Sequence, residues 1–380
     1  MNRRERLMAT LHGRPVDRPA VSFYEINGLD ERPDPSDPFN IYSHPSWQPL
    51  IELARERSDR IVMRGVPFLG RPPDPLKDLR QVETWYQDGS RFTRTRLRAG
   101  NRTLTEVTRR DPDVNTVWVI EHLLKDLDDL KAYLDLPQAA FGGEPDPSGV
   151  LSAEAALGDS GIVMIDTSDP ICEAAALFDL SVYTVLATTE PIWFRRLLDR
   201  FAEVIIPQTE AVAKALPGRL WRIYGPEYAS PPYLHPRSFH EFVVGYDEPM
   251  VRAIQRQGGF ARLHSHGRLR LILDEIAATG CMGLDPIEPP PQGDLELSEV
   301  RQRVGEQMVL FGNLEASDLE NLPVEEFSLK IQRALDQGIH QDGRGFVLMA
   351  SSCPYGRVLT RRALHNYERM VEMVENYGRA

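Results

Sequence analysis

The sequence predicts an α/β fold, a (β/α)8 TIM barrel with an inserted antiparallel hairpin, and three observations lead to it. Short apolar runs recur along the chain, and each is followed by an amphipathic helical segment or by an insertion. There are eight such runs, the number of strands that closes a parallel barrel. No Gly-x-Gly-x-x-Gly turn opens a helix after the first run, as an open dinucleotide-binding sheet would require. A closed barrel is therefore favoured over an open sheet.

The expected elements follow one another in the barrel order. The chain opens with a helix over residues 3–11, which ends before Gly13 and Pro15. The eight expected strands are residues 20–26, 60–65, 161–166, 220–225, 260–264, 281–286, 308–312 and 345–350. Further helices are expected over residues 49–57, 123–136, 191–216, 239–257, 269–279 and 324–337. Residues 1–380 are therefore expected to form one barrel domain, a size that a barrel with insertions reaches.

Two segments between the early strands depart from this alternation. Residues 27–47 are rich in Pro, Asp and Ser, which predicts a surface loop over one end of the barrel. Residues 91–120 alternate polar and apolar side chains around residues 99–101, which predicts an antiparallel hairpin. Such an insertion can form a lid or a contact in a homodimer, and both alternatives stay open.

Composition limits the classes of function. The formal net charge of -12 argues against binding to a phosphate backbone, which needs a concentrated Lys/Arg surface, so no nucleic acid partner is expected. Three scattered cysteines are too few for a disulfide framework and favour a reducing compartment. The N-terminus lacks a continuous apolar signal core, and no apolar run is long enough to cross a bilayer. We expect a soluble, cytoplasmic protein that acts on a small molecule and has no membrane partner.

Polar residues follow the ends of the expected strands. The carboxyl ends of all strands of a parallel barrel meet at one mouth, where active sites form. Burying so many polar groups without partners would be costly, so an active site is the economical explanation. These residues are Tyr24, Glu25, Arg64, Asp166, Tyr224, Glu227, His264, His266, Asp285, Glu288, Asn313 and Cys353.

Two histidines and a cysteine among them form a candidate metal site. His264 and His266 are one residue apart, so their side chains point the same way at the end of a strand. Cys353 follows the last expected strand, which can bring a thiolate beside the two imidazoles. Imidazole and thiolate are the ligands that zinc prefers. The sequence therefore predicts a zinc site made by His264, His266 and Cys353.

The other residues at the strand ends are assigned less specific roles. Candidates for catalytic proton or substrate handling are Glu227, Tyr224 and Asp285, and candidates for substrate binding are Glu25, Arg64, Asp166, Glu288 and Asn313. Each has a structural alternative. The carboxylates after a strand can cap the next helix, Asn313 can close a tight turn, and Arg64 can balance acidic neighbours. The two histidines can also be hydrogen-bonded residues that bind an anion, and Cys353 alone can be an inert buried thiol.

Four segments carry a resemblance to a known superfamily. They are residues 4–21 (RERLMATLHGRPVDRPAV), 224–243 (YGPEYASPPYLHPRSFHEFV), 263–290 (LHSHGRLRLILDEIAATGCMGLDPIEPP) and 309–319 (VLFGNLEASDL). Together they resemble the uroporphyrinogen decarboxylase superfamily, which contains porphyrinogen decarboxylases and zinc-dependent methyltransferases that work with corrinoid proteins. The resemblance spans nearly the whole chain and implies a (β/α)8 barrel.

The resemblance is closer to the methyltransferase branch. Porphyrinogen decarboxylases share an early Arg-Gln-Ala-Gly-Arg-Tyr run that holds substrate carboxylates, and this chain reads SFYEIN at residues 22–27 instead. An acidic protein with carboxylates near its mouth is also poorly suited to a polyacidic porphyrinogen. The methyltransferases hold zinc by a His-x-Cys pair and a later Cys. Here His264 and Cys353 match the outer ligands, and His266 stands where the middle Cys is expected.

The resemblance implies a metal-dependent methyltransferase or demethylase that moves a methyl group between a small molecule and a corrinoid protein. Zinc is the implied cofactor. The corrinoid would come from a separate partner protein, because the chain has no Asp-x-His-x-x-Gly corrinoid-binding motif. One alternative is a decarboxylase of a non-porphyrin acid, in which the histidines protonate a carbanion without metal. Another is a barrel that binds a ligand without turnover.

Overall fold

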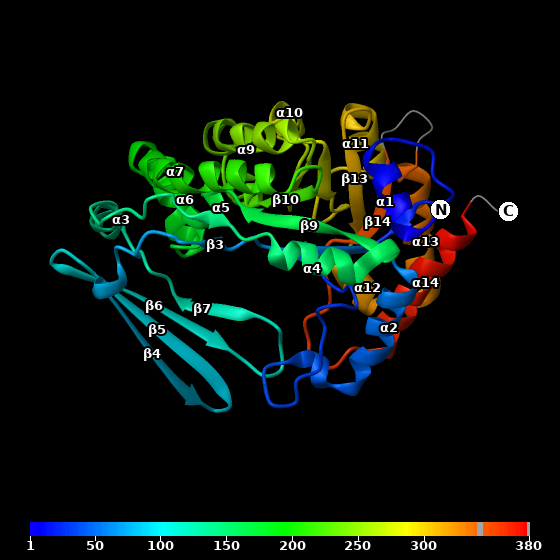
Figure 1. Cartoon of the computed structure of the whole chain (residues 1–380), viewed down its shortest axis with the longest axis horizontal. Helices are drawn as coiled ribbons and strands as arrows, with labels where there is room; N and C mark the ends of the chain where they lie inside the picture. The colour runs from blue at the N-terminus through cyan, green and yellow to red at the C-terminus, as the bar shows by residue number, and fades with distance from the viewer. Residues whose placement is uncertain (340–344, 378–380) are drawn as a thin grey trace.

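A computed structural model describes residues 1–339 and 345–377 of the chain. Its core is an eight-stranded parallel sheet with the strand order β1-β14-β13-β12-β11-β10-β9-β2 (Figure 1). The strands are β1 (Ala20–Val21), β2 (Arg60–Arg64), β9 (Gly161–Ser168), β10 (Leu220–Tyr224), β11 (Phe260–Ser265), β12 (Gly283–Pro286), β13 (Val309–Leu314) and β14 (Phe346–Ala350). Each overlaps one of the eight expected strands, although β1 covers only the first two of residues 20–26. The prediction of a TIM barrel is confirmed.

The two ends of this sheet are brought together by one carboxylate. Asp59, just before β2, donates its backbone N–H to the carbonyl oxygen of Val21 in β1 at 2.7 Å. Its side-chain Oδ2 accepts the N–H of Val21 at 2.9 Å, and Arg6 and Arg18 form ion pairs with the same carboxylate at 2.7 Å. Asp59 is fully buried. A paired carboxylate at this position therefore joins β1 to β2 where the sheet has no strand ladder.

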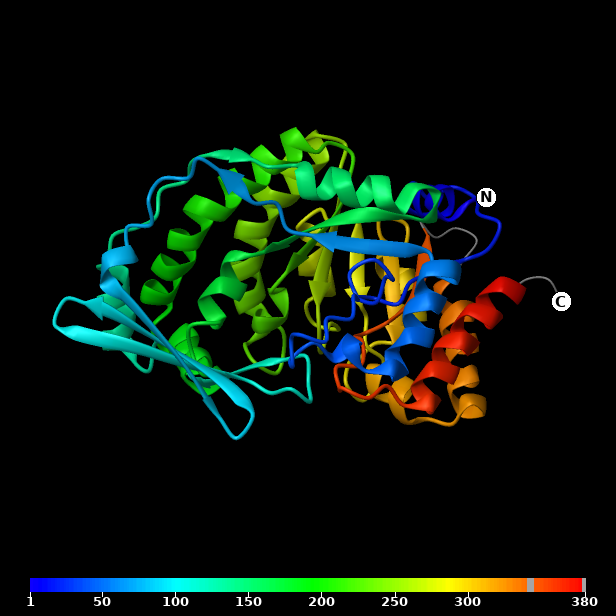
Figure 2. The ribbon, with the colours of Figure 1, turned by 60° about the horizontal axis from the view of Figure 1, so that its bottom comes forward.

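Helices cover the outside of the barrel (Figures 1 and 2). They are α1 (Arg3–Leu11), α2 (Gln48–Arg57), α3 (Leu127–Leu134), α4 (Ser148–Leu157), α5 (Pro170–Ala175), α6 (Leu180–Thr189), α7 (Pro191–Ala215), α8 (Pro236–Phe239), α9 (Gly245–Arg256), α10 (Leu273–Ala278), α11 (Leu297–Val304), α12 (Ala316–Asn321), α13 (Val324–Gly338) and α14 (Arg361–Asn376). Short turns of helix are η1 (Ile41–Ser43), η2 (Pro45–Trp47), η3 (Lys77–Leu79), η4 (Gly158–Ser160), η5 (Pro226–Ala229) and the π-helical η6 (His240–Val244). Across the described residues, every helix is too short or too polar to span a lipid bilayer.

The insertion is larger than the expected hairpin. Strands β5 (Ser90–Ala99) and β6 (Arg102–Arg110) pair antiparallel around the turn at Gly100 and Asn101, as the sequence predicts. They are flanked by β4 (Arg80–Gln87) and β7 (Val117–Glu121), so the hairpin is the centre of a four-stranded sheet. A separate ribbon of β3 (Phe68–Leu69) and β8 (Glu144–Pro145) links it to the barrel. Strand β4 lies before the expected range of residues 91–120, and β7 lies at the end of that range, where the sequence predicted part of a hairpin and not a separate outer strand.

The inserted sheet is attached to the loop that follows β14. Arg357 in this loop donates its backbone N–H to the Asp113 carbonyl at 2.7 Å. Its guanidinium donates to the carbonyls of Pro112 and Pro38, and its own carbonyl accepts the indole N–H of Trp47. Because the insertion arises in the connection after β2, this attachment holds it beside the carboxyl ends of the barrel strands.

Candidate active site

Most of the predicted residues lie at the carboxyl ends of β9 to β12. Cross-strand register explains much of this arrangement, because Arg222 of β10 is paired with both Asp166 of β9 and Arg262 of β11. In the same way, His264 of β11 lies opposite Asp285 of β12. Neighbouring parallel strands place such partners side by side on one face of the sheet. A row of charged side chains therefore crosses the inside of the barrel.

His264 is oriented by a buried carboxylate. Its Nδ1 lies 2.8 Å from Oδ2 of Asp285, and the other oxygen of Asp285 lies 2.8 Å from Nε of Arg262 in an ion pair too poorly aligned for a hydrogen bond. Burial opposes ionisation of Asp285, but Arg262 and His264 outweigh it and lower the pKa of this carboxyl. An ionised Asp285 accepts a hydrogen bond from Nδ1–H, so in the neutral imidazole Nε2 of His264 carries the free lone pair.

His266 is held in a parallel way by Glu288. Its Nδ1 lies 2.8 Å from Oε1 of Glu288, whose Oε2 accepts the backbone N–H of Gly267 at 2.8 Å. Burial acts to lower the pKa of His266, but the hydrogen bond and the charge of Glu288 outweigh it and raise the pKa. The rings of His264 and His266 meet edge to face, with centroids 4.7 Å apart. Two imidazoles, each fixed by its own carboxylate, thus share one corner of the mouth.

Arg222 forms a second buried group that the sequence analysis missed. Its guanidinium binds both oxygens of Asp166, at 2.6 and 2.9 Å, and donates to the hydroxyl of Tyr24 at 2.5 Å. The Tyr24 ring stacks on His264 at 6.1 Å between centroids, and Tyr24 has a left-handed backbone with φ 57°. Asp166 is therefore engaged by protein. An arginine inside the apolar run LWRIY was the available signal, because a buried charge requires a partner.

Cys353 lies beside Glu25. Its Sγ donates to Oε2 of Glu25 at 3.3 Å, and the residue is buried with 7 % exposure. Burial and the negative charge of Glu25 raise the pKa of the thiol well above its usual range. Cys353 is therefore a thiol that donates a hydrogen bond to Glu25.

The three predicted metal ligands are not gathered around a common point in this structure. Within residues 1–339 and 345–377, no group of three or more His, Cys, Asp or Glu side chains is arranged to hold a metal ion. The two imidazoles meet the chemical requirement, because carboxylates on Nδ1 leave Nε2 free to coordinate. A metal-bound form would need the Cys353 thiol to leave Glu25 and lose its proton. Zinc ligation by His264, His266 and Cys353 stays a prediction.

The remaining predicted residues lie around this centre. Arg64 forms an exposed ion pair with Asp30 at 2.7 Å. The Tyr224 ring lies 5.2 Å from the Arg222 guanidinium, and burial raises the pKa of Tyr224 to about 12. Glu227 accepts the backbone N–H of Gly225 at 3.0 Å, and its charge contributes to the raised pKa of His266. Asn313, at the end of β13, is buried with 7 % exposure. Their roles in catalysis or substrate binding stay predictions.

Two buried carboxyl groups behind Glu227 also escaped the sequence analysis. Asp169 caps α5 by accepting the N–H of Cys172 at 2.7 Å, and its second oxygen is buried without a partner. Both oxygens of Asp247 on α9 are buried without a hydrogen-bond partner among the described residues. Burial, followed by the charge of Glu227, raises the pKa of Asp247 well above its usual range. Burial and then Asp247 do the same for Asp169. The pair therefore favours its protonated form.

Replacing Asp247 with Asn should stabilise the protein at neutral pH. A carboxyl whose pKa is raised by folding contributes stability below its unfolded pKa, and this contribution is lost as pH rises through the folded pKa. At pH 7 the side chain therefore opposes folding, and the neutral amide should raise the free energy of unfolding by about 1–3 kcal/mol. Urea denaturation at pH 7 and pH 4 should show a gain that shrinks at the lower pH. The exposed change Asp159→Asn is the control, and a loss of stability in Asp247→Asn at pH 7 would contradict the assignment.

Comparison with known proteins places the chain in a family. Residues 167–377, more than half of the chain, match the family described as uroporphyrinogen decarboxylase (URO-D). The chain belongs to this family. The matched segment holds Arg222, both histidines with their carboxylates, and Cys353, whereas Glu25 and Arg64 precede it. A search of curated proteins finds no match to this chain.

One solved structure supports the architecture. A methyltransferase from Methanosarcina mazei is 18 % identical, with 99 % of each chain covered and a TM-score of 0.62. A D-psicose 3-epimerase from Clostridium cellulolyticum H10 is 11 % identical, with 62 % of this chain and 83 % of that chain covered and a TM-score of 0.37. At these identities the likeness concerns the fold, and only the first structure matches it closely over the whole chain.

Proposed function

We propose that this URO-D family member is an enzyme that moves a methyl group between a small molecule and a separate corrinoid protein. The observation that carries the proposal is the pair of imidazoles at the barrel mouth, each with Nδ1 bound to a carboxylate. Support comes from the methyltransferase fold that the chain matches along its whole length. The partner is required because the sequence lacks a corrinoid-binding motif of its own.

The described side chains suit the handling of a substrate next to a transferred methyl group. Asp285 and Glu288 fix both rings, so Nε2 of each can bind a substrate or accept its proton without reorientation. Arg222, neutralised by Asp166, holds the Tyr24 hydroxyl beside His264. Zinc at His264, His266 and Cys353 would supply a Lewis acid for the substrate. The chain itself supplies orientation and proton transfer.

A surrogate for the methylated corrinoid partner tests this proposal. Methylcobalamin and a panel of small thiols are incubated with the purified protein, and demethylation is followed by the absorbance of the corrinoid. In the expected step a thiolate sulfur bonds to the methyl carbon, the cobalt–carbon bond breaks, and its electron pair stays on cobalt as cob(I)alamin. Enzyme-dependent demethylation with formation of the methyl thioether supports methyl transfer. Failure with every thiol, and with amines and phenols as acceptors, would argue against it.

Decarboxylation of a non-porphyrin acid is the second candidate. It is favoured by the raised pKa of His266, because a protonated imidazole at the mouth can deliver a proton to a carbanion. Release of CO2 from a panel of small carboxylic acids, with incorporation of one solvent deuterium in the product, would identify this reaction. It predicts full activity after metal chelation, which separates it from a metal-dependent methyl transfer.

Metal content tests the proposed cofactor. We expect one zinc ion per chain in the purified protein, and loss of that zinc in both His266→Ala and Cys353→Ala because each removes a proposed ligand. Elemental analysis of proteins with matched circular dichroism spectra gives the result. Cys281→Ala is the control, because it changes a buried thiol that is hydrogen-bonded to the carbonyl oxygen of Ile276. Zinc retained in both ligand variants would show that it binds elsewhere, and metal-free wild type would favour the decarboxylase.

A further inference from the structure

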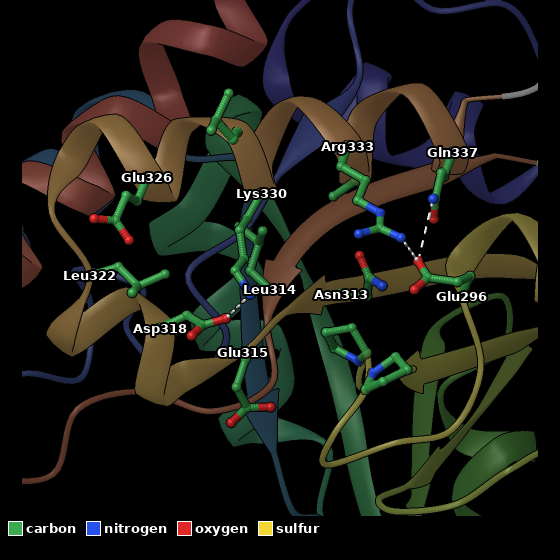
Figure 3. Close-up of a pocket in the computed structure, with 14 residues that line it drawn as sticks. Glu296, Asn313, Leu314, Glu315, Asp318, Leu322, Glu326, Lys330, Arg333 and Gln337 are labelled. Atoms are coloured by element: carbon green, nitrogen blue, oxygen red, sulfur yellow. Dashed lines mark hydrogen bonds and ion pairs between the residues drawn. The ribbon is translucent and has the colours of Figure 1, made fainter.

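Two parts of the surface differ in what they leave unpaired. The cavity between β13 and α13 is lined by two cations, and both are paired within the chain (Figure 3). Nζ of Lys330 lies 2.8 Å from Oδ2 of Asp318, and Nη2 of Arg333 lies 2.9 Å from Oε2 of Glu296. The outer edge of the inserted sheet is the opposite case, because there the backbone itself lacks partners.

Strand β4 forms this outer edge (Figure 1). Among the described residues it pairs with one strand only, β5, and it lies on the side of the inserted sheet that faces away from the barrel. All of its residues except Trp85 are exposed, and Val82 and Tyr86 are 61 % and 68 % exposed. β4 therefore offers an extended, accessible backbone to a further strand.

The turn after β4 shows which backbone groups point outward. Asp88 and Gly89 both have left-handed backbones, with φ 50° and 81°, so a two-residue type I′ turn joins β4 to β5. The residue before such a turn, here Gln87, points its backbone groups toward β5, and the direction alternates along the strand. The residues whose N–H and C=O groups point away from β5 are therefore Val82, Thr84 and Tyr86.

This edge lacks the features that prevent pairing between sheets. Natural edge strands are short, bulged, or interrupted by proline or lysine. At the opposite edge β7 has five residues, and its ladder with β6 shifts in register between Val107 and Thr108. β4 has eight residues, contains neither proline nor lysine, and pairs with β5 without a register shift. Of the two edges, β4 is the one open to another strand.

The sequence of β4 is complementary to itself in the antiparallel direction. With Thr84 opposite Thr84 of a second copy, Val82 lies opposite Tyr86, and Arg80 lies opposite Asp88. Val82 and Tyr86 are on one face of the sheet, so their exposed apolar side chains pair across the two strands. Arg80 binds one carboxylate of its own chain through Nη1 at 2.7 Å, which leaves its other donors to reach Asp88.

Neighbouring registers are less favourable. Because outward-pointing residues must face each other, the nearest alternatives place the two-fold axis at Glu83 or at Trp85. The first sets two Glu83 carboxylates opposite each other, and like charges in this position are destabilising. The second sets Val82 opposite Asp88 and loses the apolar pairs. The register centred on Thr84 is therefore preferred.

We propose that two copies of this chain associate through antiparallel pairing of their β4 strands, with Thr84 on the two-fold axis. The outward-pointing backbone groups then find partners, and four strands from each copy form one continuous sheet. Because the contact is confined to one strand and its side chains, association is weak and depends on protein concentration. The pairing does not involve the barrel mouth, so it stands or falls separately from the proposed function.

Sedimentation equilibrium of the full-length protein, from about 1 to about 300 µM, should show reversible dimerisation. Thr84→Pro should weaken it at least tenfold, because each copy loses the N–H at the axis while the bonds between β4 and β5 are retained. Thr84→Ala keeps this N–H and is the matched control, with an association constant within twofold of wild type. Circular dichroism confirms that each variant is folded. A monomer throughout this range, or equal association constants in the two variants, would overturn the proposal.

A disulfide tests the register. The Cα atoms of a hydrogen-bonded antiparallel pair are about 5.5 Å apart, within the reach of a disulfide. With oxidised glutathione, Thr84→Cys should therefore give a covalent dimer on non-reducing electrophoresis. Val82→Cys is the matched control on the same face, because its two copies would lie about 13 Å apart along the strands. Wild type, with its three cysteines, gives the background. Equal linkage in both variants, or none in Thr84→Cys, would contradict the proposed pairing.

Discussion

Replacing Asp285 with Asn will destabilise the protein by about 3–5 kcal/mol, because it leaves the Arg262 guanidinium buried without a counter-charge. Arg262 is 1 % exposed, and its Nε lies 2.8 Å from Oδ1 of Asp285. The ring of Phe311, 4.8 Å from the guanidinium carbon, cannot replace a full negative charge. Urea denaturation at pH 7 measures the loss.

A matched change at the surface gives the comparison. Asp30→Asn removes the partner of Arg64 from a solvent-exposed ion pair and should cost less than about 1 kcal/mol. The double variant Asp285→Asn/Arg262→Met should recover most of the stability lost in the single variant, because it removes the orphaned charge. If Asp285→Asn and Asp30→Asn cost the same, the buried pair does not hold the barrel interior together as described.

Replacing His266 with Ala should lower turnover about 10²–10⁴-fold, the range lost when a positioned acid–base group is removed. Its side chain is 35 % exposed, so the change should leave the free energy of unfolding almost unaltered. The measurement is the rate of demethylation of methylcobalamin, or of CO2 release if that reaction is found. Added imidazole should restore part of the rate if the ring transfers a proton.

His365→Ala is the control for this experiment. His365 is an exposed residue of α14, and its loss should leave turnover unchanged. Glu288→Gln adds a second readout. It removes the charge that raises the pKa of His266, so the limb of the pH–rate profile that reports this group should move to lower pH. Full activity in His266→Ala would show that the chemistry lies elsewhere on the barrel.

The barrel could be predicted from sequence because its strands are covered on both faces. β11 is buried along its whole length, so its residues read as a continuous apolar run interrupted only where a side chain enters the site. The outer strands of the insertion could not be found in this way. In β7 the side chains of Trp118 and Val119 point to opposite faces, yet both are exposed, so burial does not distinguish this strand from the rest of the range predicted as a hairpin.

The site was predictable in position and less so in its pairings. The position of His264 and His266 at the end of an expected strand placed both at the mouth. The structure adds that each ring is hydrogen-bonded to a carboxylate on the next strand or the loop after it. The Arg222–Asp166 pair depends on the register between β10 and β9, which sequence spacing does not reveal. The contact between Cys353 and Glu25 joins residues 328 positions apart, and only the closed barrel brings them together.

The hydrogen bonds of Arg357 give the insertion a mechanical connection to the thiol. Three residues separate Arg357 from Cys353, and the same arginine binds Pro112 and Asp113 in the connection between β6 and β7. The segment that carries the sulfur is therefore fixed at one end by its contact with Glu25 and at the other by the inserted sheet.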